Sequence, residues 1–273
     1  MSLVLAHLSD LHFGAGLELE RTTASLVRSL IRRNVDHVVI SGDVTDRGRW
    51  EEYERFWTCL APLRQVAEVS VVPGNHDRLG QDVAGTIMEN DRVLTSRHEG
   101  LFMIRMDSTA PHNCRYAFEG HGSIHDRDLM QLDRALDRAR PGERVVVTMH
   151  HHPLPLPEEG RLERISAWFG LPFTAELSMG SELIACLRGR CDLLLHGHRH
   201  IPAERWLFED EDRALRVVNA GQSSGLGLAR LFDYGSDVDP RTPSRWLSAT
   251  EGDRPTRIVP PRAHHERLHI APP

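Results

Sequence analysis

Along the first 80 residues, short apolar runs alternate with longer amphipathic stretches. Apolar runs of this length between turn signals are typical of buried strands. They predict strands at 3–8, 37–40 and 69–72. The amphipathic stretches predict helices at 19–33 and 50–63, and in the first of these Leu26 and Leu30 recur at helical spacing. Because strands alternate with helices, we expect a sheet whose faces are covered by helices.

The second half of the chain has fewer amphipathic stretches between its apolar runs. One helix is predicted at 127–139, where Leu129, Leu132 and Leu136 share a face and a Pro-Gly pair follows. Strands are predicted at 101–106, 144–149, 192–195, 206–208, 215–218 and 228–232. The last three have no helix between them. We therefore expect an α/β fold in which two sheets pack face to face with helices outside.

Two segments fit neither pattern. The stretch 153–180 contains four prolines and mixed charge, so we expect a long irregular loop, which in compact domains is usually functional or mobile. From 235 to 273 the sequence is dominated by Pro, Arg, Asp and Ser, and we expect an irregular tail. The folded domain is accordingly placed at 1–234.

Composition narrows the possible chemistry. Hydrophobic residues make up 40% and charged residues 26% of the 273 residues, as in ordinary globular proteins, and no apolar run is long enough to cross a membrane. The net charge of −6 disfavours general nucleic-acid binding. All 33 basic residues are Arg, which excludes P-loop and lysine-nucleophile chemistry.

The cysteine pattern and the first residues of the sequence indicate the cellular compartment in which the protein is expected. The four Cys residues form no CxxC pair and fit neither a zinc ribbon nor a disulfide framework, so we interpret them as buried free thiols. The segment 1–14 has no basic stretch and no cleavage site typical of a signal peptide. These features predict a cytoplasmic protein with no membrane partner.

The 17 His residues are the unusual part of the composition, and many lie in clusters with Asp and Asn. Five clusters follow the C-terminal ends of predicted strands, where loops converge in α/β sheets. They are Asp10-Leu11-His12, Gly42-Asp43-Val44-Thr45-Asp46-Arg47-Gly48, Gly74-Asn75-His76-Asp77, His150-His151-His152-Pro153 and His196-Gly197-His198-Arg199-His200. Carboxylate, amide and imidazole ligands suit a pair of divalent cations such as Mn²⁺, Fe²⁺ or Zn²⁺. Glycines at 42, 74 and 197 are expected to allow sharp turns beside them.

The order of these motifs, D-x-H, GD-x-x-D-x-G, GNHD, H-H-x-P and GH-x-H, resembles the calcineurin-like metallophosphoesterase superfamily over roughly residues 3–220. GNHD, the HHHPLP segment and the modest length make the chain most similar to small bacterial phosphodiesterases of the cyclic-nucleotide type. The resemblance implies a four-layer α/β/β/α sandwich, a catalytic domain over 1–234 and a two-metal centre that cleaves phosphoester bonds with a metal-bridging hydroxide.

The resemblance also implies a ligand set. One metal would be held by Asp10, His12, Asp43 and His200. The other would be held by Asp43, Asn75, His150 and His198, with His151 as the alternative to His150. Two divalent cations bring about +4 in charge, two carboxylates and a hydroxide remove about three units, and the net of about +1 suits a phosphate anion.

Four further residues receive expected roles. His76 would hydrogen-bond the phosphate or protonate the leaving oxygen, and Asp77 would orient the His76 ring. Asp46 is expected to cap the turn that presents Asp43, and Arg47 either clamps a phosphate oxygen or lies in solvent.

Several functions share these motifs. The favoured one is a phosphodiesterase acting on a small nucleotide-like or other organic phosphodiester. A phosphomonoesterase or a nucleotide pyrophosphatase would use the same centre, and a non-catalytic metal-binding scaffold is the remote alternative. The segment 153–180 is expected to overhang the metals and shape the leaving-group pocket. The sequence leaves the oligomeric state open, a homodimer included.

Overall fold

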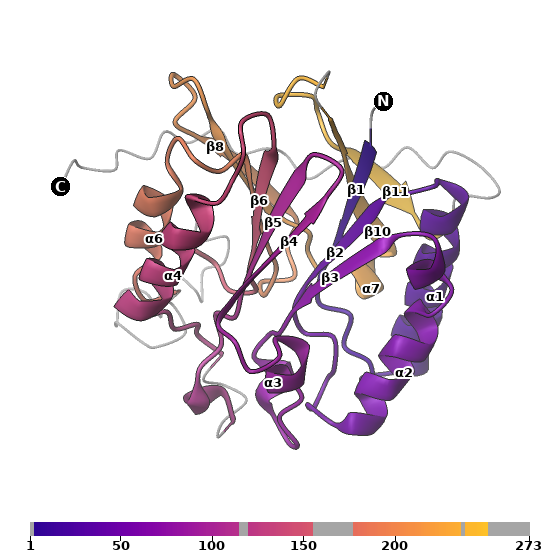
Figure 1. Cartoon of the computed structure of the whole chain (residues 1–273). Coiled ribbons are helices and arrows are strands. Elements are labelled where there is room, and N and C mark those ends of the chain that lie inside the picture. Colours follow the sequence, from indigo (N-terminus) through magenta and orange to yellow (C-terminus); the bar gives the residue numbers. More distant parts are fainter. Residues whose placement is uncertain (1–2, 115–119, 155–176, 236–237, 251–273) are drawn as a thin grey trace, which may run out of the picture.

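The computed structural model describes residues 3–114, 120–154, 177–235 and 238–250. Its strands form two sheets that face each other, with helices on both outer sides (Figure 1). The four-layer α/β/β/α sandwich implied by the family resemblance is therefore confirmed.

The first sheet has five strands in the order β11-β10-β1-β2-β3. Its strands are β1 (Leu3–Leu8), β2 (His37–Ser41), β3 (Glu68–Val72), β10 (Leu228–Tyr234) and β11 (Arg245–Ser248). The first three strands run parallel, with Leu5 opposite His37. β10 is antiparallel to β1 and to β11, so a late segment of the chain lies beside the first strand.

The second sheet has six strands in the order β4-β5-β6-β7-β9-β8. Its strands are β4 (Val93–His98), β5 (Leu101–Met106), β6 (Arg144–Thr148), β7 (Leu193–His196), β8 (Ala203–Leu207) and β9 (Leu215–Asn219). The four central strands are parallel, and the two edge strands β4 and β8 are antiparallel to their neighbours.

Helices cover the outer faces of the sheets. The longer ones are α1 (Leu17–Arg32), α2 (Trp50–Leu60), α4 (Asp126–Leu136) and α6 (Gly180–Leu187), and single turns form α3 (Ala84–Ile87) and α7 (Ser223–Leu226). Leu26 and Leu30 are fully buried on the inner side of α1, as the spacing predicted. Glu18 and Glu20 lie in its first turn and Arg32 in its last, where they complement the helix dipole.

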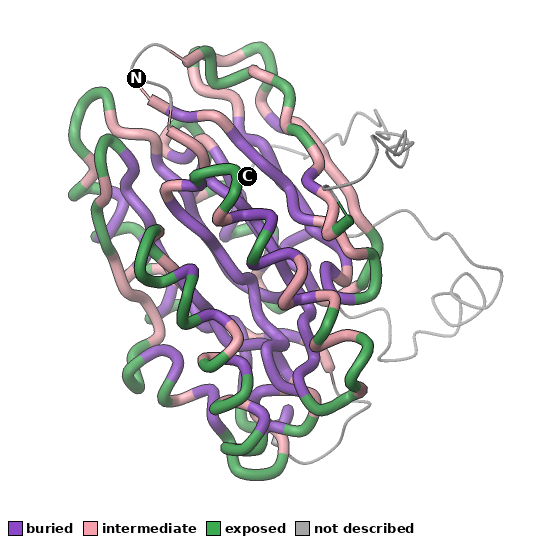
Figure 2. Tube along the Cα trace, turned by 90° about the vertical axis from the view of Figure 1, so that its right-hand side faces the viewer, coloured by how far each residue is buried: buried purple, intermediate pink, exposed green. Residues whose placement is uncertain are grey.

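Three apolar layers fill the sandwich. One lies between α1, α2 and the first sheet and includes Leu26 and Phe56. A second lies between α4, α6 and the second sheet and includes Leu132. The third, with Val39 and Val146, lies between the two sheets. Buried residues accordingly run along the strands while exposed ones follow the outer surface (Figure 2). This packing holds the strands rigidly, so the loops at their ends have fixed roots.

The structure differs from the pattern-based expectations at several elements. β4 and α6 were not predicted, and β11 lies at Arg245–Ser248, within the segment expected to be an irregular tail. β11 pairs with β10 through Leu247, which is buried against α1, so tertiary burial outweighs its weak local pattern. Residues 251–273 lie outside the described residues, as does 155–176 of the expected irregular loop.

No helix among the described residues is long and apolar enough to cross a membrane.

Candidate metal centre

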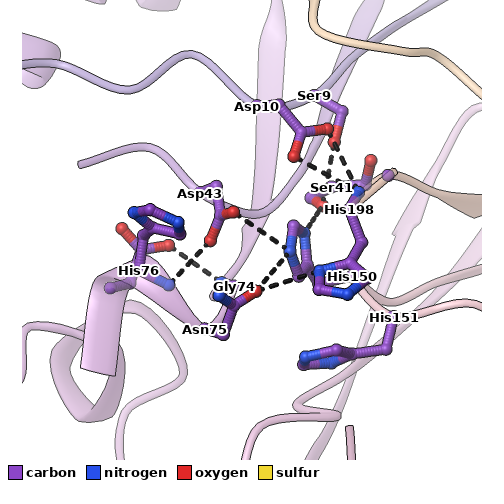
Figure 3. Close-up of polar contacts among 12 residues, drawn as sticks. Ser9, Asp10, Ser41, Asp43, Gly74, Asn75, His76, His150, His151 and His198 are labelled. Atoms are coloured by element: carbon purple, nitrogen blue, oxygen red, sulfur yellow. Dashed lines mark hydrogen bonds and ion pairs between the residues drawn. The ribbon is translucent and has the colours of Figure 1, made fainter. Parts of the chain in front are cut away.

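All five polar clusters predicted from the sequence meet at one edge of the sandwich. They follow the C-terminal ends of β1, β2, β3, β6 and β7. Figure 3 shows Asp10, Asp43, Asn75, His150 and His198 directed toward a common centre. Segments that are as much as 188 residues apart in the chain contact each other there.

The backbone at this edge has an unusual conformation. Five of the seven predicted ligands have a positive φ: Asp10 (55°), His12 (48°), Asp43 (50°), His198 (77°) and His200 (57°). Side-chain-bearing residues rarely adopt this region, and each one costs on the order of 1 kcal/mol or more. Such strain is typical of functional sites, where the surrounding fold holds a side chain in an otherwise unfavourable direction.

The first group of donors is Asp10, His12, Asp43 and His200, whose ligand atoms lie within 4.8 Å of one another. Nε2 of His200 lies 3.3 Å from Oδ1 of Asp10, and Nε2 of His12 lies 3.9 Å from Oδ2 of Asp43. The two Nε2 atoms of His12 and His200 are 3.2 Å apart. Two imidazole nitrogens that converge in this way need a shared proton or a cation, so the donor set fits a metal ion.

The second group surrounds the amide oxygen of Asn75. That oxygen lies 3.1 Å from Nε2 of His150 and 3.0 Å from Nδ1 of His198. Nε2 of His150 also lies 3.3 Å from Oδ2 of Asp43. One oxygen of Asp43 therefore faces both His12 of the first group and His150 of the second. This is the geometry that a bridging carboxylate requires.

His150 and His151 have different surroundings. Nδ1–H of His150 donates to the backbone oxygen of Ser41 (2.8 Å), which directs Nε2 toward Asp43. His151 is held through Nδ1 by the hydroxyl of Ser108 (2.8 Å), and its Nε2 is buried with no hydrogen-bond partner among the described residues. The geometry favours His150 as the ligand, although His151 lies within 4.8 Å of His150 and His198.

Charge compensation is strong in this buried site. Burial alone would raise the pKa of Asp43, but His150, His76 and His12 hold that pKa well below its usual value. Burial lowers the pKa of His150, yet the Asp43 and Asp10 carboxylates raise it to about 9. For His198, burial and the neighbouring His150 lower the pKa to about 3. Buried carboxylates that attract protons onto their neighbours attract cations for the same reason.

The glycines of the motifs are needed largely because neighbouring atoms leave no room for a Cβ atom. Gly42 has a positive φ of 95°, as expected for a sharp turn. At Gly74 and Gly197 the reason differs from the expectation. A Cβ on Gly74 would lie 2.1 Å from Oδ1 of Asp43, and one on Gly197 would lie 2.5 Å from Oδ2 of Asp10. These two glycines leave room for the carboxylates of Asp43 and Asp10.

The His76 ring lies beside the first group. Its Nδ1–H donates to the backbone oxygen of Asp46 (2.7 Å), and its backbone N–H donates to Oδ1 of Asp43 (2.9 Å). Burial lowers the pKa of His76, but Asp43 and the Asp46 carbonyl outweigh that effect and raise it. The ring centroids of His76 and His12 are 4.7 Å apart, so His76 adjoins the first group of donors.

Asp77 has a different role from the one expected. Its buried carboxylate accepts hydrogen bonds from the N–H groups of Gly74 (2.8 Å), Val44 (3.3 Å) and Thr45 (2.9 Å), and from the Thr45 hydroxyl (2.7 Å). The prediction that Asp77 orients the His76 ring is therefore wrong, because the backbone of Asp46 does so. Asp77 instead ties the loop after β3 to the loop after β2.

Asp46 and Arg47 lie at the outer side of the site. Nδ1 of His12 is 3.8 Å from the Asp46 carboxylate. The Arg47 side chain is 66% exposed and pairs with Asp46 at 3.4 Å, as a solvent-facing residue would. The His200 side chain is 43% exposed, so the centre opens to solvent beside it.

Serines that the sequence analysis did not single out hold the predicted ligands in place. The hydroxyl of Ser108 accepts from the backbone N–H groups of His150 (3.3 Å) and His151 (3.2 Å). The hydroxyl of Ser224 donates to the backbone oxygen of Asp10 (3.0 Å). No local pattern distinguishes these serines, because their partners are distant in the chain.

Comparison with known sequences agrees with the family resemblance of the motifs. The family model described as calcineurin-like phosphoesterase matches residues 3–202. A protein named glycerophosphodiester phosphodiesterase GpdQ, from Enterobacter lignolyticus (strain SCF1), is 31% identical over 56% of this chain and 58% of its own length. The 3',5'-cyclic adenosine monophosphate phosphodiesterase CpdA of Pseudomonas aeruginosa is 30% identical over 57% of each chain. The chain thus spans little more than half the length of these relatives.

Solved structures show the same fold. A dimetal phosphatase from Danio rerio superposes with a TM-score of 0.60 over 91% of this chain and 99% of that chain, at 13% identity. A purple acid phosphatase from yellow lupin seeds gives 0.59 over 81% of this chain and 44% of that chain, at 12% identity. At these identities the likeness concerns the fold.

Proposed function

This chain belongs to the calcineurin-like phosphoesterase family, and on that premise we propose that it is a dinuclear metal-dependent phosphohydrolase. The observation that carries the proposal is the position of Asp43, whose Oδ2 faces His12 at 3.9 Å and His150 at 3.3 Å. A carboxylate shared by two groups of donors is what two adjacent cations require.

We assign one cation to Asp10, His12, Asp43 and His200, and the other to Asp43, Asn75, His150 and His198. When bound, the two divalent cations would supply positive charge for the phosphoryl oxygens and would lower the pKa of a bound water molecule. The cations would be Mn²⁺, Fe²⁺ or Zn²⁺, which all accept this set of oxygen and nitrogen ligands.

We assign to His76 the role of donating a proton to the leaving oxygen. With Nδ1–H bound to the Asp46 carbonyl, Nε2 is the ring atom left for the substrate. Because the neighbouring carboxylates raise its pKa, the ring carries a second proton more readily than a free imidazole. It can therefore donate to a phosphate oxygen and then to the departing alkoxide.

We propose a small organic phosphodiester as the substrate, of nucleotide-like or similar size. The support comes from the relatives, which are named as phosphodiesterases for glycerophosphodiesters and for cyclic adenosine monophosphate. The net charge of −6 disfavours a polyanionic nucleic acid as substrate. The cytoplasmic location and the assignment of 1–234 as the catalytic domain stay predictions.

The test is a hydrolysis screen of purified protein loaded with Mn²⁺. Its substrates are bis(p-nitrophenyl) phosphate, p-nitrophenyl phosphate, cyclic AMP and a nucleoside diphosphate conjugate. We expect the diesters to be hydrolysed faster than the monoester, with about two metal ions per chain. The control is Asp43→Asn, which keeps the side-chain volume and removes the charge.

Each other result has a definite meaning. Faster hydrolysis of the monoester or of the diphosphate conjugate would overturn the diester assignment. Metal binding without hydrolysis of any substrate would indicate a scaffold. Full activity of Asp43→Asn would contradict the dinuclear mechanism itself.

A further inference from the structure

Two buried histidines outside the predicted ligand set form a hydrogen bond beside the metal centre. Nδ1 of His152 lies 2.9 Å from Nδ1 of His196, and the two ring centroids are 4.5 Å apart in an edge-to-face arrangement. Both residues are buried. The hydrogen bond spans 44 residues of the chain and joins the loop after β6 to the last residue of β7.

Each member of this pair lies two residues from a predicted metal ligand. His152 follows His150, and His196 precedes His198. The imidazoles of His150 and His198 approach the same amide oxygen of Asn75, at 3.1 Å and 3.0 Å (Figure 3). Both of these ligands belong to the second cation, which is the one assigned to Asp43, Asn75, His150 and His198.

The two ends of the hydrogen bond differ in how firmly the backbone holds them. His196 belongs to β7 and lies opposite Asn219 of β9 inside the sheet. His152 lies four residues beyond Thr148, where β6 ends. The hydrogen bond therefore fixes the far end of a loop to a strand, and His150 lies between the end of β6 and this fixed point.

The loop that carries His198 also needs support from its surroundings. The φ of His198 is 77°, a conformation that is unfavourable for a residue with a side chain and persists only where the surrounding structure holds it. The backbone N–H of Gly197 donates to the oxygen of His150 (3.0 Å), so a backbone hydrogen bond joins the same two loops. The imidazole pair adds a side-chain hydrogen bond to this connection.

The His152 ring acts through a single atom. Its Nε2 is buried and has no hydrogen-bond partner among the described residues, whereas its Nδ1 faces His196. In a hydrogen bond between two imidazoles, one Nδ1 donates and the other accepts. A side chain that offers a donor or an acceptor at the position of Nδ1 can therefore replace the ring, and an apolar side chain cannot.

We propose that His152 and His196 are positioning residues for the second cation. Their hydrogen bond holds the loops after β6 and β7 at the separation at which both imidazole ligands of that cation reach it. The inference rests on the proposed function, because it takes the second cation to be bound by His150 and His198. Neither member of the pair contacts the cation, and both act through the backbone that carries the ligands.

Calorimetric titration of the metal-stripped full chain with Mn²⁺ tests the proposal. The unmodified chain should bind about two cations. In His152→Leu, the second cation should bind about 10–100-fold more weakly, as is typical when a group that positions a ligand is lost. The first cation should bind as before. His152→Asn should restore the affinity for the second cation, because its amide can donate or accept at the position of Nδ1.

Two background variants identify which cation is affected. His200→Gln removes a ligand of the first cation, and His198→Gln removes a ligand of the second. Added to His200→Gln, the His152→Leu change should weaken the binding step that remains. Added to His198→Gln, it should leave the remaining step unchanged, because that step belongs to the first cation.

His37→Leu is the matched control for the loss of a buried imidazole. His37 is 2% exposed, and its Nε2 lies 2.9 Å from the Ser70 hydroxyl. It lies at the start of β2, whereas the metal centre follows the end of that strand. His37→Leu should change the melting temperature of the metal-free protein and leave the affinity for both cations unchanged.

A second disruptive variant keeps the test decisive if His152→Leu does not fold. His196→Val removes the other half of the hydrogen bond, and its β-branched side chain suits the end of a strand. It should cause the same selective loss of the second cation. Circular dichroism and the melting temperature of the metal-free protein show whether each variant is folded.

The results that would overturn the inference differ from those that would overturn the proposed function. An unchanged second cation in the folded disruptive variants, or equal weakening of both cations, would exclude the positioning role and leave the proposed function standing. Failure of His152→Asn to restore the affinity would exclude it as well. Binding of fewer than two cations by the unmodified chain would contradict the proposed function and this inference together.

Discussion

The backbone oxygen of Asp46 lies 2.7 Å from Nδ1 of His76 and fixes the direction of that ring. A carbonyl oxygen can only accept, so Nδ1 carries the proton and Nε2 faces the site. Asp46 is itself held by its N–H bond to the oxygen of Phe13 (2.9 Å). The loops after β1, β2 and β3 are thereby joined at an imidazole that lies beside the first group of predicted ligands without belonging to it.

Replacing His76 by Ala should reduce catalysis and leave the metal centre in place. General acids contribute about 10²–10⁴-fold to a reaction rate, and we expect kcat to fall by about 10²–10³-fold. KM should change little, and the metal content should stay equal to that of the unmodified chain. Steady-state kinetics and elemental analysis of the same preparation measure both quantities. Loss of metal together with activity would contradict the assignment, since His76 would then be a ligand.

The choice between His150 and His151 can be decided by paired substitutions. His150→Gln should release metal, because Nε2 of His150 lies 3.1 Å from Asn75 and 3.3 Å from Asp43. His151→Gln should keep it, because the partner of His151 is the Ser108 hydroxyl. Metal content per folded chain, with folding checked by circular dichroism, is the measurement. The reverse pattern would make His151 the ligand.

Two glycines should prove as important to metal binding as the ligands. In Gly74→Ala the new methyl would occupy the position of the Asp43 carboxylate, at 2.1 Å from its Oδ1. In Gly197→Ala it would lie 1.8 Å from Oγ of Ser9 and 2.5 Å from Oδ2 of Asp10. Displacing groups that position a ligand typically costs about 10–100-fold in metal affinity.

A third glycine provides the matched control for this prediction. A Cβ on Gly16 meets nothing within 4 Å, and its φ of 173° is extended. Gly16→Ala should therefore leave metal affinity unchanged. Titration of metal-stripped protein with metal, monitored by calorimetry, measures the metal affinity of the three variants. Equal affinities in all three would show that the close packing around Asp10 and Asp43 is not needed.

The pattern of apolar and polar residues along the chain predicted the short strands and the polar clusters that follow them. The strands ending before Asp10, Asp43 and Asn75 are short apolar runs, and the polar clusters follow them directly. Because parallel strands end at one edge of a sheet, their convergence could be expected before the structure was known. The positions of the predicted ligands in the loops after β6 and β7 follow from the same reasoning.

Features that depend on distant partners could not be predicted in this way. The sequence of β4, Val93–His98, mixes polar and apolar residues, and its pairing with β5 decides its conformation. Asp77 accepts hydrogen bonds from Thr45, 32 residues away, which no spacing rule indicates. The positive φ of Asp10 and His198 likewise arises from the assembled loops. In each case tertiary contacts outweigh local propensity.

A buried histidine far from the metal centre should make stability depend on pH. His37 lies at the start of β2, and its Nε2 is 2.9 Å from the Ser70 hydroxyl. Burial, with smaller effects of His98 and Arg105, lowers its pKa from 6.5 to about 4. Between these values the unfolded chain binds a proton that the folded chain does not. The stability contribution is therefore complete above pH 6.5 and is lost as the pH falls toward 4.

The His37→Gln variant isolates this effect from the other buried histidines. A pKa difference of this size corresponds to about 3 kcal/mol in the free energy of unfolding. Urea unfolding of both proteins, from pH 8 down to about pH 4.5, gives the difference between their stabilities at each pH. That difference should be constant above pH 6.5 and shrink or change sign below it, because only the unmodified chain must protonate His37 on unfolding. If the difference between the two stabilities instead stays constant at acidic pH, the folded protein binds a proton at His37 as readily as the unfolded chain. The ring would then have to be hydrated rather than enclosed between β2 and β3.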